Sequence, residues 1–164
     1  MILYLVRHGI AIDPNDPKAP PEPERQLTAK GVQKTRGAAL GLKELGVKPD
    51  VLITSPYVRA AQTAEIFAEA LGFSPQKIRT NDALKPSANP AEITREIIRL
   101  KAKEVMCFGH APHLDLMIAH LVGNQTAFTS LKKAGIACLD HSASRAKWEL
   151  NWIVAPKMLR QLAE

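Results

Sequence analysis

Short apolar runs alternate along this chain with longer segments whose apolar residues recur every three or four positions. The runs are typical of buried strands and the longer segments of amphipathic helices. Strands are predicted at residues 2–6, 51–53, near 78, 105–108, 134–139 and 148–154. This alternation favours a single α/β domain with a mostly parallel, helix-covered central sheet. The last two strands are separated only by a polar turn around residues 141–145, which favours an antiparallel hairpin at one edge.

Capping residues mark the predicted helices. The first takes Thr28 as its N-cap and continues to the glycine at position 46. The second takes Ser55 as its N-cap, has Pro56 at its first helical position and ends at Gly72. Two more are predicted, one before and one after the strand at 105–108, so helices are expected on both faces of the sheet.

Length and composition indicate an ordinary globular protein. The 164 residues fit one domain spanning 1–164, and 46% hydrophobic with 23% charged residues is typical of soluble proteins. No apolar run approaches the roughly 20 residues of a membrane span, and Arg7-His8-Gly9 interrupts the first run too early for a signal peptide. We therefore expect a cytoplasmic protein with no membrane contact. Cys107 and Cys138 lie in apolar runs and are predicted to be reduced, buried thiols.

The net charge of +6 and a pI near 9.5 suggest anionic partners. The lysines and arginines are scattered, with no run of five or more and no interleaved aromatic residues, so nucleic-acid binding is only weakly indicated. An acidic protein partner or a phosphorylated substrate explains the excess equally well.

Three polar motifs follow predicted strands: Arg7-His8-Gly9, the segment 55–59 (Ser-Pro-Tyr-Val-Arg) and the segment 109–112 (Gly-His-Ala-Pro). Because ligands bind at the carboxyl ends of strands in open α/β sheets, we expect Arg7, His8, Arg59 and His110 to meet at one rim. Burying cations at this rim costs desolvation free energy, unless the cations bind an anion or take part in proton transfer. The motifs therefore predict a phosphate pocket.

Histidine and arginine together suit phosphoryl transfer. A neutral imidazole can attack phosphorus and form a phosphohistidine intermediate. His8 is the better nucleophile candidate because it directly follows a strand, and His110 would flank the transferring group. Arginine forks bind phosphate oxygens bidentately, and with a protonated second histidine they would stabilise the transferring group without a metal.

These three motifs resemble the signatures of the histidine phosphatase superfamily, the phosphoglycerate-mutase-like enzymes, and within it the SixA-type phosphohistidine phosphatases. Two further segments share the resemblance. Residues 24–31 are similar to that group's Arg-Pro-Leu-Thr segment, with Gln26 where proline is usual, and residues 135–156 are similar to its C-terminal hairpin.

The resemblance implies His8 as the phosphorylated nucleophile, with Arg7, Arg59 and His110 in the phosphate pocket. It implies Arg25 as a further phosphate-contacting arginine. It also implies a phosphoglycerate-mutase-like fold, no cofactor, no metal, and phosphate or sulfate as ligands of the pocket.

One departure from the family pattern bears on the substrate. Larger members place a catalytic glutamate after the third strand to protonate an alkoxide, whereas residues 81–86 here carry Lys85 at the comparable place. A phosphoramidate releases an imidazole, which leaves far more easily than an alkoxide. Asp82 could donate a proton, although an exposed turn position is the simpler interpretation. The chain is also too short for the inserted cap of many relatives, which favours a site open to a protein surface.

The sequence therefore predicts a metal-independent phosphatase acting on phosphohistidine in a protein, such as a phosphorelay transfer domain. A phosphatase for small phosphomonoesters and a non-catalytic phosphoprotein-binding module are the alternatives. The intact His8 argues against the module, because binding alone needs only the arginines.

Other features have structural interpretations. The proline-rich loop at 13–26 is either a lid over the site or a solvated surface excursion. His113, His120 and His141 are expected to be structural. The spacing of His110, His113 and Asp115 matches no familiar metal site.

Overall fold

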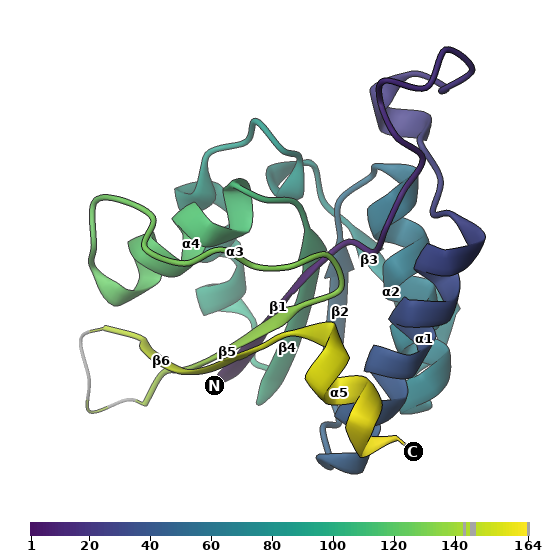
Figure 1. The fold of residues 1–164 in the computed structure, drawn as a ribbon. Coiled ribbons are helices and arrows are strands. Elements are labelled where there is room, and N and C mark those ends of the chain that lie inside the picture. The colour runs from purple at the N-terminus through teal and green to yellow at the C-terminus, as the bar shows by residue number, and fades with distance from the viewer. Residues whose placement is uncertain (143, 145–146, 164) are drawn as a thin grey trace.

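A six-stranded sheet with the strand order β3-β2-β4-β1-β5-β6 forms the centre of the protein (Figure 1). The structure is a computed structural model, and it describes residues 1–142, 144 and 147–163. The strands are β1 (Ile2–Arg7), β2 (Val51–Thr54), β3 (Arg79–Thr80), β4 (Glu104–Gly109), β5 (Ile136–Asp140) and β6 (Glu149–Val154). Strands β1 to β4 pair in parallel, whereas β5 pairs antiparallel with both β1 and β6. The predicted α/β sheet with an antiparallel edge hairpin is confirmed. Residues 143 and 145 of the predicted hairpin turn lie outside the described part of the chain.

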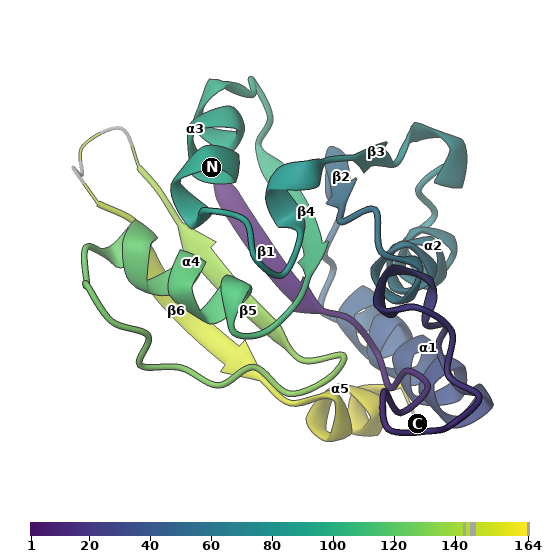
Figure 2. The same ribbon diagram turned by 90° about the horizontal axis from the view of Figure 1, so that it is seen from above.

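Helices cover both faces of this sheet (Figure 2). They are α1 (Ala29–Glu44), α2 (Val58–Leu71), α3 (Pro90–Arg99), α4 (His113–Val122) and α5 (Pro156–Leu162). Three short 3₁₀ turns, η1 (Glu22–Glu24), η2 (Pro75–Lys77) and η3 (Asp82–Leu84), lie in the connections. Among the described residues, no helix combines the length and apolar character needed to cross a membrane.

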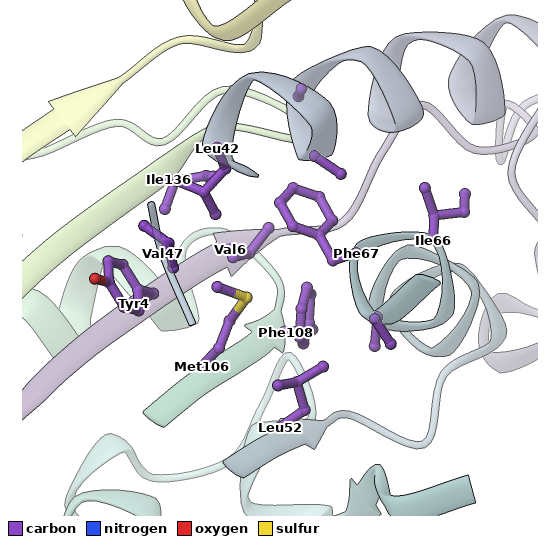
Figure 3. Packing of buried hydrophobic residues seen from close by; sticks show 14 of the residues in the cluster. Tyr4, Val6, Leu42, Val47, Leu52, Ile66, Phe67, Met106, Phe108 and Ile136 are labelled. Carbon is purple, nitrogen blue, oxygen red and sulfur yellow. The ribbon is translucent and has the colours of Figure 1, made fainter. Parts of the chain in front are cut away.

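Alternation along the strands divides the interior into two cores. Successive residues of a strand point to opposite faces, so Tyr4 and Val6 contribute to one core and Leu3 and Leu5 to the other. The first core, shown in Figure 3, lies under α1, α2 and α5, where Phe67 packs its ring edge-on against a strand phenylalanine. The second lies under α3 and α4. The central strands β1, β2 and β4 are buried on both faces, so they present their polar groups at their ends.

The helix boundaries confirm some capping predictions and correct others. Thr28 is the N-cap of α1, and its side-chain oxygen accepts a hydrogen bond from the Gly31 N–H at 3.0 Å. The prediction that Ser55 caps α2 is wrong, because Tyr57 is the N-cap and the helix begins at Val58. The Ser55 hydroxyl is instead used at the rim of the sheet. There it accepts a hydrogen bond from the Tyr57 N–H at 3.3 Å.

Helix α5 is an element that the sequence pattern did not predict. It begins directly after β6 with Pro156 at its first position and packs along α1. Two glycines of α1 make the close approach possible. A Cβ at Gly41 would collide with the carbonyl oxygen of Leu159, and one at Gly37 would come within 2.8 Å of the Arg160 side chain.

We predict that Gly41→Ala destabilises the protein despite the higher helix propensity of alanine. The new methyl group must push α5 away from α1, and such overpacking costs about 1–3 kcal/mol. The measurement is the free energy of unfolding in urea. Gln33→Ala, at an exposed position of the same helix, is the control and should leave stability nearly unchanged. A Gly41→Ala protein at least as stable as the wild type would contradict the packing argument.

Candidate active site

A pocket of about 280 Å³ lies at the carboxyl ends of β1, β2 and β4. Its walls come from the end of β1, the proline-rich loop, α2 and the segments after β4 and before β5. The lining residues are Arg7, His8, Ala11, Pro14, Glu22, Arg25, Arg59, Pro86, His110, Ala111 and Lys133. All five side chains predicted for the site, from four separate segments, are therefore brought together.

His8 is held as a neutral imidazole with one unprotonated nitrogen. Its Nδ1 lies 2.7 Å from the carbonyl oxygen of Gly9, and a carbonyl oxygen can only accept. The proton therefore sits on Nδ1 and the lone pair on Nε2, to which Arg59 Nε–H donates at 3.3 Å. Burial, aided by the charges of Arg59, Arg7 and Lys133 and opposed by the Gly9 hydrogen bond, lowers the pKa of His8 to about 3.

His110 lies beside His8, with the ring centroids 5.2 Å apart. Its Nε2 is hydrogen-bonded to the Ser55 hydroxyl at 2.9 Å, and Tyr57 packs edge-on against the ring. Burial, followed by the proximity of His8 and Arg59, lowers the pKa of His110 to about 2. This low pKa favours a neutral His110 over the protonated second histidine that the sequence predicted. The buried Nδ1 has no partner and is the ring atom left for a ligand.

The three arginines differ in how they are held. Arg59 is almost completely buried, and Arg25 is nearly so. Arg7 donates through Nη1 to the carbonyl oxygen of Leu131 at 2.7 Å, and its buried Nε has no partner. Burial lowers the pKa of Arg7 and of Arg59, yet guanidinium groups stay charged at any working pH. The pocket is strongly electropositive.

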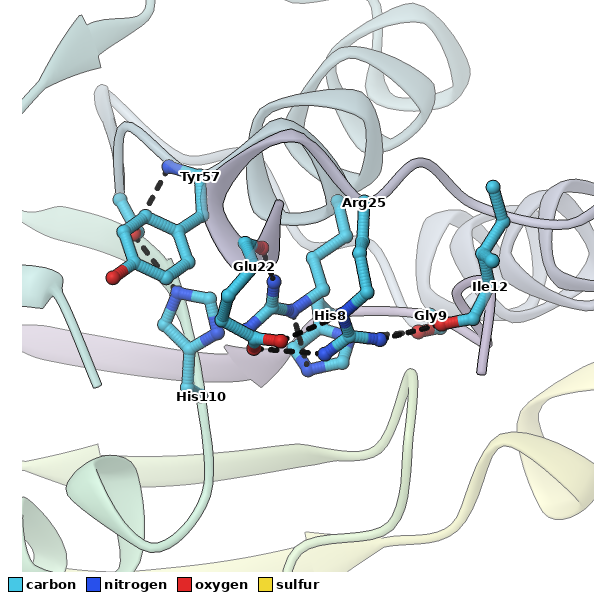
Figure 4. A network of polar contacts seen from close by, with 9 residues as sticks. His8, Gly9, Ile12, Glu22, Arg25, Tyr57 and His110 are labelled. Atoms are coloured by element: carbon cyan, nitrogen blue, oxygen red, sulfur yellow. Dashed lines mark hydrogen bonds and ion pairs between the residues drawn. The ribbon is translucent and has the colours of Figure 1, made fainter. Parts of the chain in front are cut away.

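Glu22, which the sequence analysis missed, contacts two of these arginines (Figure 4). Its Oε1 accepts hydrogen bonds from Arg25 Nη2 at 2.8 Å and from Arg59 Nη2 at 2.7 Å, while its Oε2 accepts from Arg25 Nε at 2.7 Å. The hydrogen bond from Arg25 holds the pKa of Glu22 below its usual range. An ionised carboxylate thus occupies the donors that a phosphoryl group would use. The only sequence signal was an acid three residues before Arg25.

Two residues of α2, one turn after Arg59, connect the walls of the pocket. Thr63 Oγ1 accepts a hydrogen bond from the Gly9 N–H at 3.0 Å and donates to the Arg59 carbonyl oxygen at 2.7 Å. Gln62 Oε1 accepts from the Leu27 N–H at 2.8 Å. One turn of α2 therefore fixes both the backbone beside His8 and the end of the proline-rich loop.

Asp115, which the sequence analysis considered only as part of an unlikely metal cluster, supports the site from behind the pocket. Its Oδ1 accepts hydrogen bonds from Thr129 Oγ1 at 2.7 Å and from the Leu131 N–H at 3.0 Å. Because the carbonyl oxygen of Leu131 holds Arg7, Asp115 fixes the segment that positions an arginine of the pocket. Across the part of the chain that is described, no group of three or more His, Cys, Asp or Glu side chains is arranged so that it could hold a metal ion.

The proline-rich loop forms one wall of the pocket. Pro14, Glu22 and Arg25 line it, and a β-bridge between Ala11 and Leu27 closes the base of the loop. The loop is mostly exposed, but these three residues border the site. Asp82, in contrast, lies outside the pocket, is exposed, and pairs with Lys85 at 2.8 Å. The turn interpretation of Asp82 is confirmed.

We predict that Glu22→Gln tightens binding of inorganic phosphate. The neutral amide competes less well for Arg25 and Arg59, and a lost charge-assisted contact is worth about tenfold in affinity. The measurement is the inhibition constant of phosphate. Glu24→Gln, an exposed acid in the same turn outside the pocket lining, is the matched control. Weaker phosphate inhibition in Glu22→Gln alone would show that the carboxylate supports anion binding rather than competing with it.

We also predict that the two pocket histidines destabilise the fold in acid. Unfolded imidazoles take up protons near pH 6.5, whereas His8 does so only near pH 3 and His110 near pH 2. The stability that they contribute is complete above about pH 6.5 and falls as the pH drops, by about 1 kcal/mol per histidine between pH 6.5 and 5.5.

The measurement is urea unfolding across this range, with imidazole NMR titration of His8 in parallel. The His8→Gln protein should show a correspondingly weaker pH dependence. A midpoint near 6.5 for His8 in the folded protein would contradict the prediction.

Comparison with known proteins agrees with this geometry. Residues 3–86, which are 84 of the 164, match the model of the histidine phosphatase superfamily (branch 1). A protein of uncharacterised function from Picosynechococcus is 36% identical, over 97% of this chain and 99% of that protein. The phosphohistidine phosphatase SixA of Escherichia coli is 26% identical, over 98% of this chain and 97% of its own.

A solved structure of the protein histidine phosphatase SixA complexed with tungstate has the same fold. It superposes with a TM-score of 0.87 at 24% identity, covering 97% of this chain and 99% of that one. The family model matches half of the chain, and the matched part includes the segments that carry Arg7, His8 and Arg59. The chain belongs to the histidine phosphatase superfamily.

Proposed function

We propose that the protein is a metal-independent phosphatase that removes the phosphoryl group from phosphohistidine on a protein, such as a phosphorelay transfer domain. One observation carries the proposal: the unprotonated Nε2 of a neutral, buried His8 lies at the guanidinium of Arg59, inside a pocket rich in cations. A nucleophile and an anion clamp at hydrogen-bond distance are the two groups that phosphoryl transfer needs.

The reaction takes two displacements. His8 Nε2 attacks phosphorus, the bond from phosphorus to the substrate imidazole breaks, and that imidazole takes up a proton from water. Water then attacks the phosphorus of phosphorylated His8, which releases inorganic phosphate and restores Nε2. Arg59, Arg25 and Arg7 balance the charge of the equatorial oxygens in both steps. Phosphate or sulfate should bind at the same donors, displacing Glu22.

The proposed phosphohistidine substrate is supported by the lack of a general acid among the described residues of the pocket. Among the described residues that line it, Glu22 is the only acid, and it is held ionised by Arg25 and Arg59. Such a carboxylate is a poor proton donor for an alkoxide. An imidazole leaving group needs no strong acid. The similarity to SixA proteins supports the same substrate class, and two buried, free cysteines fit a reducing cytoplasm.

The substrate is tested with a phosphohistidine peptide against a panel of small phosphomonoesters, assayed with excess chelator. We expect turnover of the peptide to be unaffected by the chelator and faster than that of every ester. Rapid turnover of esters with none of the peptide would support the small-molecule alternative. Binding of the peptide without any turnover would support the non-catalytic module.

We predict that His8→Ala lowers kcat by about 10³-fold or more, because no other group in the pocket replaces the nucleophile. Mass spectrometry under alkaline quench should detect a phosphorylated His8 peptide in the wild type and not in the variant. The variant should keep its circular dichroism spectrum and its affinity for phosphate. Wild-type turnover in His8→Ala would exclude His8 as the nucleophile.

A further inference from the structure

A second cavity, of about 550 Å³, lies beside the catalytic pocket, between α1, the segment before β5 and the start of α5. We call it the cationic groove. Among the described residues, six basic ones line it and no acidic one does. They are Arg7, Lys34, Lys132, Lys133, Lys157 and Arg160.

The strand directions explain why these cations gather at the catalytic rim. Because β5 runs antiparallel to β1, the segment before β5 lies at the carboxyl end of β1. Because β6 runs antiparallel to β5, the end of β6 returns to the same rim, and α5 starts there. Figure 1 shows α5 against α1, where Gly41 lets the two backbones meet. Lys157 and Arg160 are thereby placed opposite Lys34.

The groove has no internal counter-charge. Within the described residues, the four cations outside the catalytic pocket, Lys34, Lys132, Lys157 and Arg160, form no ion pair with a carboxylate. The Nε of Arg7 is buried without a partner. Like charges around a concave surface repel one another and raise the local potential, which favours an anionic ligand.

The floor of the groove indicates what kind of anion fits. The floor contributes apolar surface between the lysines, from Ile10, Ala134, Ala155 and Pro156, and none of the described residues that line the cavity is aromatic. Nucleic-acid sites typically combine cations with aromatic platforms for the bases. A polypeptide segment that mixes carboxylates with aliphatic side chains complements both the charge and the floor.

Arg7 and Lys133 line both the groove and the catalytic pocket. A segment bound in the groove would therefore continue directly to His8. We propose that the cationic groove docks an acidic segment of the phosphoprotein substrate next to its phosphorylated histidine. The docking proposal rests on the proposed function, because the bound segment is taken to carry the phosphohistidine. The groove and its positive charge do not depend on that function.

The test compares two phosphohistidine peptides of equal length, one with glutamate and leucine residues beside the phosphohistidine and one with glutamine in place of every glutamate. We expect the wild type to prefer the acidic peptide by about tenfold in kcat/KM at low salt, and salt to erase the preference. Lys34→Glu/Lys157→Glu should abolish the preference and leave kcat/KM for the neutral peptide unchanged. Lys34→Gln/Lys157→Gln should reduce the preference for the acidic peptide. This variant replaces the charge-reversed one if charge reversal impairs folding.

Lys48→Glu/Lys101→Glu is the matched control. It makes the same change in net charge at exposed positions before β2 and β4, at the opposite end of the strands. This variant should keep the preference. Equal kcat/KM for both peptides in the wild type would overturn the docking proposal. So would a control variant that loses the preference for the acidic peptide as fully as Lys34→Glu/Lys157→Glu does.

Binding of the unphosphorylated acidic peptide, followed by fluorescence anisotropy, separates this proposal from the proposed function. Groove-dependent binding without turnover of either phosphopeptide would refute the function and keep the docking site. Turnover of both peptides without groove-dependent binding would refute the docking site and keep the proposed function. Groove-dependent binding of a single-stranded RNA oligonucleotide in preference to the acidic peptide would also overturn the proposal.

Discussion

The hydrogen bond between His8 Nδ1 and the carbonyl oxygen of Gly9 determines the chemistry of the whole rim. It places the proton on one side of the ring and leaves the other nitrogen facing Arg59. The backbone that carries His8 is fixed on both sides, because its N–H donates to the Gly109 carbonyl oxygen at 3.0 Å and its carbonyl oxygen accepts from the Ala134 N–H at 3.1 Å. A nucleophile fixed directly after a central strand needs little reorganisation before attack.

The cost of this arrangement is a concentration of positive charge in a partly dry pocket. Glu22 offsets part of this charge, since its carboxylate accepts hydrogen bonds from both Arg25 and Arg59. A phosphoryl group carries more negative charge and three acceptor oxygens, against two for the carboxylate. Exchange of one anion for the other therefore keeps both arginines paired throughout. The lowered pKa values of His8 and His110 limit the positive charge further, because a protonated imidazole beside the arginines is unfavourable.

The sequence predicted the rim well because strand ends are local signals. An apolar run followed by a polar motif locates His8 and His110 without knowledge of tertiary contacts, and parallel pairing brings them together. The failures have tertiary causes. Ser55 has the right residue type and position for an N-cap, but its hydroxyl bonds to His110 instead. Glu22 reaches the pocket only because the loop folds back over α2, which no periodicity in the sequence encodes.

The same reason explains why the basic residues of the cationic groove looked scattered. They come from the end of β1, the middle of α1, the segment before β5 and the start of α5, and only the antiparallel return of β5 and β6 aligns these segments. Arg7 then links the groove to catalysis. Its guanidinium is held by the Leu131 carbonyl oxygen, which Asp115 positions through the Leu131 N–H. An anionic segment in the groove would thus find an arginine that is already oriented, and the charge that attracts the substrate is in part the charge that holds its phosphoryl group.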